Sequence, residues 1–194
     1  MKYVYVLTSA TKDLYYEQAL MSVYSLKLHN PSAHVVVLVD DKTKATFTAE
    51  NKRAALAQYA TEIIAVPFAD DVPNVDRSRL IKTAIPEYVS GSFLYIDCDT
   101  IIADDLSGIE RVEATTGGIL DGHCRLSEHI HKNYFLSRDK KLGFHGTSAL
   151  GGNINGGVIL AKADTEAEKE ESVALFKAWK YSAYEKHDKH DQSA

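Results

Sequence analysis

Two aspartates, Asp97 and Asp99, follow the apolar segment Phe93-Leu94-Tyr95-Ile96 with one residue between them. An ionised carboxylate is costly to bury in an apolar strand, and two neighbouring carboxylates repel each other unless a positive charge lies between them. Hard divalent cations such as Mn²⁺ and Mg²⁺ prefer oxygen ligands of this kind. Because side chains i and i+2 of a strand point the same way, both carboxylates reach one ion if the strand continues through them. The pattern predicts a metal clamp for a substrate that carries a diphosphate; the simpler alternative is a strand that ends in a polar turn.

Length and composition restrict the class of protein. We expect the 194 residues to form a single domain, 1–194, and the net charge of −5 argues against a nucleic-acid-binding protein. The sequence contains no run of 18 apolar residues, and Met1 to Leu7 is typical of a first strand rather than a signal peptide. Cys98 and Cys124 are too few for a disulfide framework or a zinc site, so a cytoplasmic location is expected.

Short apolar segments alternate with segments of helical periodicity. The first helix is expected to begin at an Asp13 N-cap and to bury one face made of Leu20, Val23, Tyr24 and Leu28. The region 123–152 is polar and glycine-containing and gives no assignment, and 70–76 is predicted to be a loop. The predicted strands are 3–7, 35–39, 63–66, 94–96, 119–120 and 158–160, and the predicted helices are 13–30, 48–59, 78–85 and 164–181.

This alternation predicts an α/β fold with a mostly parallel central sheet flanked by helices. Ligands of such sheets bind beyond the carboxyl ends of the strands, where the Asp40-Asp41 pair, Asp97 and Asp99 are all expected. No G-x-G-x-x-G follows the first strand and no G-x-x-x-x-G-K-[ST] occurs, which argues against dinucleotide redox chemistry and P-loop hydrolysis.

Further polar groups surround the predicted strands. Asn155, Gly156 and Gly157 precede the segment Val158-Ile159-Leu160, where glycines permit a close approach of the backbone to a ligand, although a simple turn into a strand is the favoured explanation for this segment taken alone. Arg77, Arg79 and Lys82 precede the metal motif, where one of them could neutralise a phosphate and another is expected on a solvated helix face.

The histidines and the cysteine of the motif have plainer interpretations. His129 and His131 lack a metal-ligand partner at a recognised spacing and are expected at the surface, as are His187 and His190. Cys98 lies between two carboxylates that would raise its thiol pKa, so it is expected to be a small filler rather than a nucleophile.

Taken in order, four of these segments resemble the family 8 glycosyltransferases, which include glycogenin and bacterial galactosyl- and glucosyltransferases that act on lipopolysaccharide. Leu94 to Thr100 resembles the family's "LYLDxDxx" metal motif, the most specific of the four. The segments that carry the resemblance are Val6-Leu7-Thr8-Ser9 with Tyr15 to Leu20 and Ser25 to Lys27, then Leu94 to Thr100, Asn155-Gly156-Gly157-Val158, and Asp191-Gln192.

The resemblance implies a GT-A type fold, a Mn²⁺ or Mg²⁺ cofactor, and transfer of a hexose from a UDP-sugar with retention of configuration. By position, Asp97 and Asp99 would be the metal ligands, and Asp191 and Gln192 would lie beside the reacting carbon. The residues expected to bind the nucleotide and sugar are Leu7, Thr8, Ser9, Tyr15, Lys82, Asp97, Cys98, Asp121, Asn155 and Gly156, with Tyr15 able to stack on the base.

One part of the family pattern is missing from the sequence. The family has a downstream H-x-x-G-x-x-K motif that supplies a third metal ligand and a lysine for the diphosphate, and the sequence ends at Ala194 before such a motif. Either the chain is truncated at its carboxyl end or the protein completes its site differently; we expect truncation, with weak donor binding.

Two other functions fit part of the sequence. The segment Ile96 to Ile101 also resembles the D-x-D-x-T of haloacid-dehalogenase-type phosphatases, in which Asp97 would be the nucleophile and Asp99 the acid/base. A domain that binds a sugar nucleotide without turnover is the second alternative. For a transferase, the acceptor is expected to be a saccharide, a lipid-linked molecule or a protein, with peripheral membrane contact left open.

Overall fold

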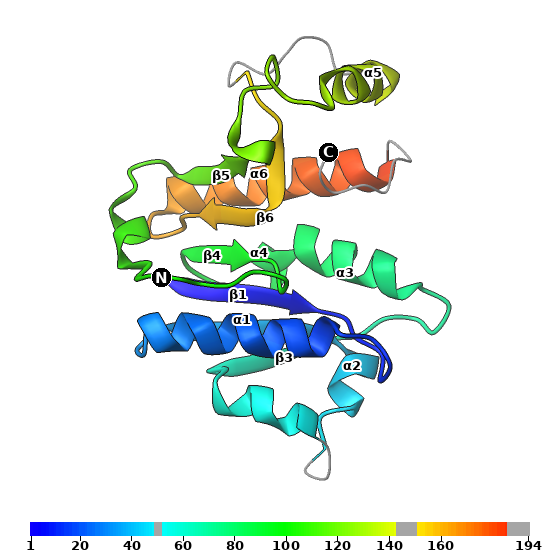
Figure 1. Ribbon diagram of the computed structural model, residues 1–194, viewed down its shortest axis with the longest axis vertical. Helices are drawn as coiled ribbons and strands as arrows, with labels where there is room; N and C mark the ends of the chain where they lie inside the picture. Colours follow the sequence, from blue (N-terminus) through cyan, green and yellow to red (C-terminus); the bar gives the residue numbers. More distant parts are fainter. Residues whose placement is uncertain (49–51, 143–150, 186–194) are drawn as a thin grey trace.

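A computed structural model describes residues 1–48, 52–142 and 151–185 (Figure 1). Its strands are β1 (Lys2–Leu7), β2 (His34–Asp40), β3 (Glu62–Val66), β4 (Phe93–Ile96), β5 (Thr116–Leu120) and β6 (Ile154–Ala161). Its α-helices are α1 (Tyr15–His29), α2 (Asp41–Ala45), α3 (Asn74–Thr83), α4 (Ile85–Tyr88), α5 (Lys132–Leu142) and α6 (Glu166–Glu185). Three 3₁₀ helices complete the list: η1 (Lys52–Gln58), η2 (Ser107–Arg111) and η3 (Asp121–His123).

The six strands form one sheet in the order β3-β2-β1-β4-β6-β5. β1 pairs in parallel with both β2 and β4, and β2 pairs in parallel with β3. β6 is antiparallel to both β4 and β5. The prediction of a mostly parallel sheet in an α/β fold is confirmed. Because strand order reverses on either side of β1, the adjoining carboxyl ends of β1 and β4 mark the edge at which ligands of open α/β sheets bind.

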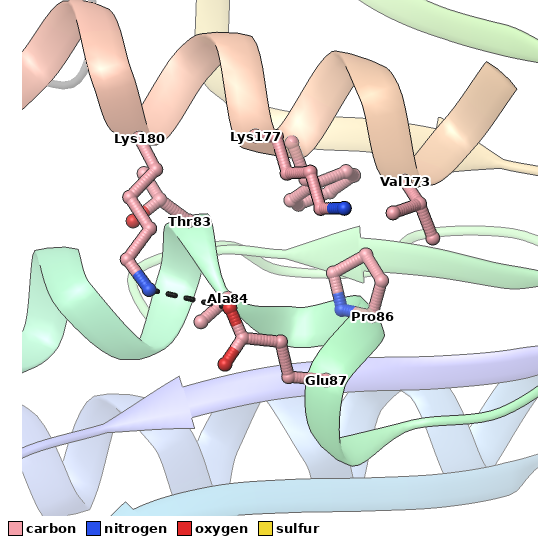
Figure 2. Close-up of a pocket in the computed structure, with 8 residues that line it drawn as sticks. Thr83, Ala84, Pro86, Glu87, Val173, Lys177 and Lys180 are labelled. Carbon is pink, nitrogen blue, oxygen red and sulfur yellow. Dashed lines mark hydrogen bonds and ion pairs between the residues drawn. The ribbon is translucent and has the colours of Figure 1, made fainter. Parts of the chain in front are cut away.

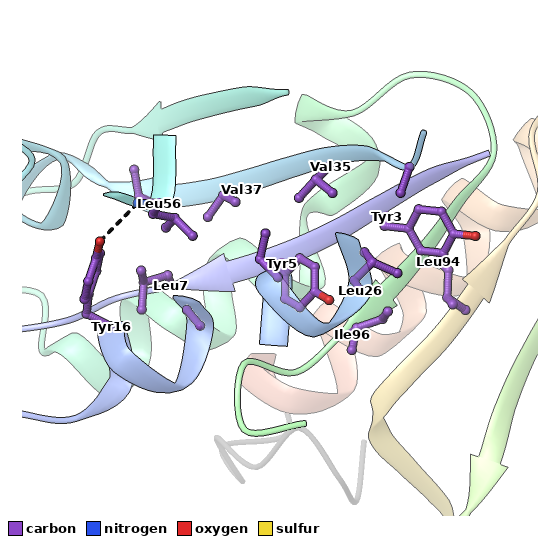
Figure 3. Packing of buried hydrophobic residues seen from close by; sticks show 14 of the residues in the cluster. Tyr3, Tyr5, Leu7, Tyr16, Leu26, Val35, Val37, Leu56, Leu94 and Ile96 are labelled. Atoms are coloured by element: carbon purple, nitrogen blue, oxygen red, sulfur yellow. Dashed lines mark hydrogen bonds between the residues drawn. The ribbon is translucent and has the colours of Figure 1, made fainter. Parts of the chain in front are cut away.

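Helices cover both faces of the sheet, and alternate residues of each strand feed two separate cores. On one face α1 and η1 pack over β1, β2 and β4 (Figure 3), and on the other face α3, α4 and α6 do so. The first core includes Tyr3, Tyr5, Leu7, Val35, Val37, Leu94 and Ile96 with Tyr16, Ala19, Val23, Leu26 and Leu56. The second includes Val4, Val6, Val36, Leu38, Phe93 and Tyr95 with Ile81, Ile85, Phe176 and Trp179.

The buried face of α1 differs from the predicted one. Val23 is buried, but Leu28 is 62% exposed and Tyr24 is also exposed. Tyr16, Ala19, Val23 and Leu26 form the buried stripe instead. The small residues Ala19, Ser22 and Ser25 on the buried side let the helix approach the sheet closely. The spacing of large apolar residues along the helix does not predict this face.

The start of α1 also differs from the prediction. Leu14 occupies the N-cap position, whereas the Asp13 carboxylate accepts hydrogen bonds from the Tyr15 amide at 3.1 Å and from the Ser9 hydroxyl at 2.7 Å. Asp13 therefore closes the loop before the helix, because its carboxylate reaches back to that loop.

Two predicted helix boundaries were wrong. Within 48–59 the described residues form only the short η1, and Thr48 lies outside it. The loop predicted over 70–76 already contains the start of α3, and the helix predicted over 78–85 ends at Thr83. Pro86 lies in α4, at a first-turn position where its missing N–H is not needed.

The segment without an assignment, 123–152, contains α5, which lies at the far end of the molecule beyond β5 and β6 (Figure 1). The predicted C-terminal helix is confirmed as α6. It starts with a capping box, in which the Glu168 carboxylate accepts from the Thr165 amide at 2.9 Å and the Thr165 hydroxyl accepts from the Glu168 amide at 3.3 Å.

α6 packs against α3 and α4 and leaves a small hollow between them, with a volume of about 60 Å³ (Figure 2). The Lys180 ammonium and the Glu87 carboxylate, 3.2 Å apart, bridge this hollow. Its lining includes none of the site residues expected from the sequence. Across the described ranges, no helix combines the length and the apolar character needed to cross a bilayer.

Asp40 is a structural residue. Its carboxylate accepts from Arg77 Nη1 at 2.8 Å and caps α2 by accepting from the Thr43 amide at 3.1 Å. The side chains of Asp40 and Arg77 are only 2% and 1% exposed. The Asp40-Asp41 pair therefore does not present two carboxylates to a ligand, and Arg77 joins α3 to β2.

We expect Arg77→Met to lower the free energy of unfolding by about 3–5 kcal/mol, because it leaves the Asp40 carboxylate buried without its cation. Urea denaturation followed by circular dichroism measures this loss. Lys180→Met removes the half-exposed pair with Glu87 and is the control, with an expected change below about 1 kcal/mol. Equal small losses for both variants would contradict the structural role of Arg77.

Candidate active site

The predicted metal motif lies at the carboxyl end of β4, beside the end of β1. The Asp97 amide donates to the Gly157 carbonyl at 2.8 Å, which extends the pairing of β4 with β6 by one residue. Cys98 and Asp99 then form a turn, which the Thr100 hydroxyl closes by donating to the Asp97 carbonyl at 2.9 Å. The strand does not continue through both aspartates, so the condition for two carboxylates on one side of a strand is not met. Asp97 is partly buried and Asp99 is exposed.

Two serines on the buried side of α1 fix the segment after this turn. The hydroxyls of Ser22 and Thr100 are 2.8 Å apart, and the Ser25 hydroxyl accepts from the Ile102 amide at 2.9 Å. Since α1 packs rigidly on the sheet, these bonds hold the turn that carries the two aspartates in one place.

The Asp97 carboxylate has one oxygen engaged by the protein. Its Oδ1 accepts from the Tyr95 hydroxyl and lies 3.4 Å from Lys82 Nζ. The Lys82 ammonium is buried and also lies over the rings of Tyr95 and Trp179, at 5.2 and 5.7 Å from their centroids. Within the part of the chain that the structure describes, no hydrogen bond reaches Oδ2. Lys82 therefore lies at the predicted site, not on a solvated helix face.

Cys98 is half-buried, and its thiol donates to the Val6 carbonyl at 3.2 Å. Burial raises the pKa of this thiol, the carboxylates of Asp97 and Asp99 raise it further, and Lys82 opposes them. The thiol stays protonated at neutral pH, as expected for a filler, so only the backbone of Cys98 is available to a nucleotide.

The loop after β1 holds the first group of predicted nucleotide-binding residues. Leu7 is buried in the core, so its backbone alone can line a ligand, whereas the Tyr15 ring is exposed. The Thr8 hydroxyl donates to the Asn74 carbonyl at 3.3 Å. The Ser9 amide donates to the Thr43 hydroxyl at 2.8 Å, which ties the loop to α2.

Arg53 holds this loop through side-chain hydrogen bonds, a role that the sequence did not predict. Its guanidinium is buried and donates to the Ser9 hydroxyl at 2.9 Å and to the Ala10 carbonyl at 2.5 Å. The same group lies 5.1 Å from the centroid of the Tyr16 ring. The Ser9 hydroxyl is therefore part of the scaffold of the loop. No sequence signal marks Arg53, because 44 residues separate it from Ser9.

Asn155, Gly156 and Gly157 lie inside β6, not in a turn before it, so the turn expected there was wrong. The Asn155 amide nitrogen donates to Asp121 Oδ1 at 3.3 Å, and its oxygen accepts from the Gly157 amide at 2.7 Å. A methyl group on Gly157 would lie 2.8 Å from both Asn155 Oδ1 and Asp97 Oδ2. The structure thus brings Asp97 and Asn155 together against Gly157, and Asn155 links them to Asp121.

Solved structures of glycosyltransferases share this arrangement of strands and helices. No protein-family model and no curated protein matches the sequence. The galactosyltransferase LgtC, solved in complex with donor and acceptor sugar analogs, has a TM-score of 0.64 and 17% identity over 100% of this chain and 68% of its own. Mouse xyloside xylosyltransferase 1 in its apo form has a TM-score of 0.59 and 10% identity over 94% of this chain and 72% of its own. The glycosyltransferase GlyE of Streptococcus pneumoniae has a TM-score of 0.57 and 17% identity, over 100% of this chain and 42% of its own.

This chain has the GT-A fold. The likeness to family 8 glycosyltransferases expected from the sequence is confirmed at the level of the fold. The position of β4 also argues against the phosphatase alternative, because three strands precede it in the chain, whereas such phosphatases generally carry the motif on the first strand of their core. Substrate and turnover are separate questions, since identities of 10–17% establish the fold alone.

In this GT-A chain the chemistry of the two aspartates fits a hard divalent cation. Asp97 Oδ2 and the exposed Asp99 carboxylate are oxygen ligands at the carboxyl end of β4, and their charge exceeds that of the single ammonium of Lys82. The residues in 1–48, 52–142 and 151–185 contain no group of three or more histidine, cysteine or acidic side chains that could hold a metal. A cation would therefore take its other ligands from substrate, water or other parts of the chain.

The predicted catalytic residues of the GT-A chain, Asp191 and Gln192, lie outside the described residues, as do His187 and His190. Their roles stay predictions. The expectation that His129 and His131 are surface residues is wrong for His129, whose side chain is only 9% exposed and whose Nε2 lies 3.5 Å from Asp121 Oδ2. Tyr95 and Trp179 were also missed, because the aromatic and apolar patterns around them predict only core packing.

Proposed function

We propose that this chain is a metal-dependent glycosyltransferase that moves a hexose from a UDP-sugar to an acceptor with retention of configuration. One observation carries the proposal: in a GT-A fold, Asp97 has one oxygen held by Lys82 and Tyr95, while the other accepts no hydrogen bond within the described residues and lies 2.8 Å from the position of a methyl group on Gly157. An Asp97 held in this way is prepared to receive a cation without reorganisation.

Different residues of the chain contact different parts of the UDP-sugar donor. Asp97 and Asp99 hold the cation, and the buried ammonium of Lys82 balances their charge beside the diphosphate. The Asp121 carboxylate accepts hydrogen bonds from sugar hydroxyls, and the Asn155 amide exchanges hydrogen bonds with them. A bound Mn²⁺ or Mg²⁺ offsets the charge that develops on the leaving diphosphate.

Other residues complete the proposed site. The exposed ring of Tyr15 stacks on uracil, next to the backbone of Leu7, Thr8 and Ser9. Asp191 and Gln192 steady the oxocarbenium-like centre that glycosyl transfer passes through. The acceptor is a saccharide, a lipid-linked molecule or a protein, and the low cysteine content supports a cytoplasmic location.

Titration calorimetry with UDP and Mn²⁺ tests the proposal. We expect UDP to bind in the presence of Mn²⁺ and binding to disappear after addition of EDTA, because the diphosphate and the two aspartates repel each other without a cation. Binding that is insensitive to EDTA, or no binding with Mn²⁺ present, would refute the metal-dependent site.

A donor hydrolysis assay separates a transferase from a domain that only binds sugar nucleotides. We expect slow release of hexose from at least one UDP-sugar in the presence of Mn²⁺. The donor is chosen by thermal unfolding, since a ligand at 100 times its Kd stabilises the native state by about 2.7 kcal/mol. Tight UDP-sugar binding without any hydrolysis or transfer would favour the binding domain.

A further inference from the structure

His129 is a buried polar side chain in an exposed, polar segment. Its side chain is 9% exposed, whereas its neighbours Ile130 and His131 are exposed. Gly122, with φ +62°, turns the chain so that this segment returns over η3. A methyl group on Gly122 would lie 3.0 Å from His129 Nε2, so the turn approaches the ring as closely as a glycine permits.

Two contacts fix the orientation of the His129 ring. The His131 amide donates to Nδ1 at 3.0 Å, and the edge of the ring meets Phe135, with centroids 5.0 Å apart. A backbone amide can only donate, so Nδ1 is an acceptor and the neutral ring carries its proton on Nε2. Nε2 is the atom that faces Asp121 Oδ2, at 3.5 Å.

Asp121 is therefore held from two sides. Asn155 donates to its Oδ1 at 3.3 Å, and the Nε2–H of His129 faces its Oδ2. The Asp121 amide also donates to the carbonyl of Asn153, the residue before β6, at 2.7 Å, which fixes its backbone beside the start of that strand. A carboxylate restrained in this way presents its remaining lone pairs in one direction, which is what recognition of a sugar hydroxyl requires.

We propose that His129 is a positioning residue that orients the Asp121 carboxylate toward the hydroxyl groups of the donor sugar. The inference rests on the proposed function, because it assigns the sugar moiety to Asp121. It is specific to the sugar: the uracil and the diphosphate are assigned to the β1 loop and to Asp97 and Asp99.

Calorimetry with Mn²⁺ and three probes, UDP, UDP-glucose and UDP-galactose, tests the role of His129. His129→Phe keeps a ring against Phe135 but removes both nitrogens, and His129→Gln keeps a donor near the position of Nε2. We expect His129→Phe to bind whichever UDP-sugar the wild type binds about tenfold more weakly, the size expected when one polar contact to a carboxylate is lost. Its affinity for UDP should stay within about twofold, and His129→Gln should restore most of the loss.

A double-mutant cycle with Asp121→Asn completes the test. If His129 acts through Asp121, His129→Phe causes no further loss of UDP-sugar affinity in the Asp121→Asn background. His131→Phe, at the exposed neighbouring histidine, is the matched control and should bind as the wild type does. Equal weakening of UDP and UDP-sugar, or a folded His129→Phe with wild-type affinity for both, would overturn the positioning role. A wild type that binds none of the three probes would instead refute the proposed function.

Discussion

Asp99→Asn is expected to abolish most of the Mn²⁺-dependent binding of UDP while leaving the fold intact. The substitution removes one of the two negative charges that hold the cation, and the loss should be at least the 10- to 100-fold range, about 1.4–2.7 kcal/mol, seen when residues behind metal ligands are changed. The Asp99 side chain is exposed, and no described residue hydrogen-bonds its carboxylate. The free energy of unfolding should therefore change by no more than about 0.5 kcal/mol.

Calorimetry with UDP and Mn²⁺ and thermal unfolding without ligand measure the two effects of Asp99→Asn. Asp71→Asn is the matched control, because it removes the same charge from an exposed position in the loop before α3. Wild-type UDP affinity in Asp99→Asn would contradict the metal clamp. A similar loss in Asp71→Asn would mean that net charge, not the motif, governs binding.

Gly157→Ala is expected to lower donor turnover, kcat/KM, by about 100-fold, the cost of misplacing catalytic groups by about 1 Å. The new methyl group would lie 2.8 Å from both Asp97 Oδ2 and Asn155 Oδ1, so both side chains must move. Both contacts are with the ends of side chains rather than with backbone, so the stability cost should stay within about 1–3 kcal/mol. The substitution thus displaces the proposed metal ligand Asp97 and the proposed sugar ligand Asn155 together without unfolding the sheet.

Gly117→Ala is the control for this prediction. Gly117 lies in the neighbouring strand β5, and a methyl group there would meet Leu160 Cβ at 3.7 Å, an ordinary van der Waals contact. Donor hydrolysis and Mn²⁺-dependent UDP affinity should be close to wild type for Gly117→Ala and low for Gly157→Ala. Wild-type turnover in a folded Gly157→Ala would show that the position of Asp97 Oδ2 is not critical.

Local sequence patterns predicted most strands and helices, because the burial of a segment determines its pattern of apolar residues. The all-apolar segment Val35 to Val39 is typical of a strand covered on both faces, and it is the centre of β2, fully buried. The face of α1 was predicted poorly, because apolar residues such as Leu28 occur on its exposed side and two buried serines, Ser22 and Ser25, occur on the side that faces the sheet. Those serines are buried because the loop after β4 supplies their hydrogen-bond partners.

The residues of the candidate site also fall into two groups, those that the sequence predicted and those that it did not. Asp97, Asp99 and Asn155 were predicted from the sequence, because carboxylates and amides next to apolar strands are chemically conspicuous, and Lys82 was predicted as a cation for a phosphate. The structure places Lys82 beside Asp97, and their roles stay predictions. Arg53 and His129 were not predicted, since their partners are remote in sequence or belong to an irregular turn.

The sequence by itself determined the alternation of strands and helices and the placing of acidic residues at the carboxyl edge of the sheet, because hydrophobic periodicity and the cost of burying charge act over a few residues. Only the tertiary structure decided which of those acids is neutralised inside the protein. Asp40 ends a buried strand and meets the buried guanidinium of Arg77, whereas Asp97 follows a buried strand, meets the ammonium of Lys82 with one oxygen and keeps the other without a hydrogen bond from the described residues. Whether a carboxylate is neutralised from within depends on which helix packs beside it, and that is a property of the assembled fold.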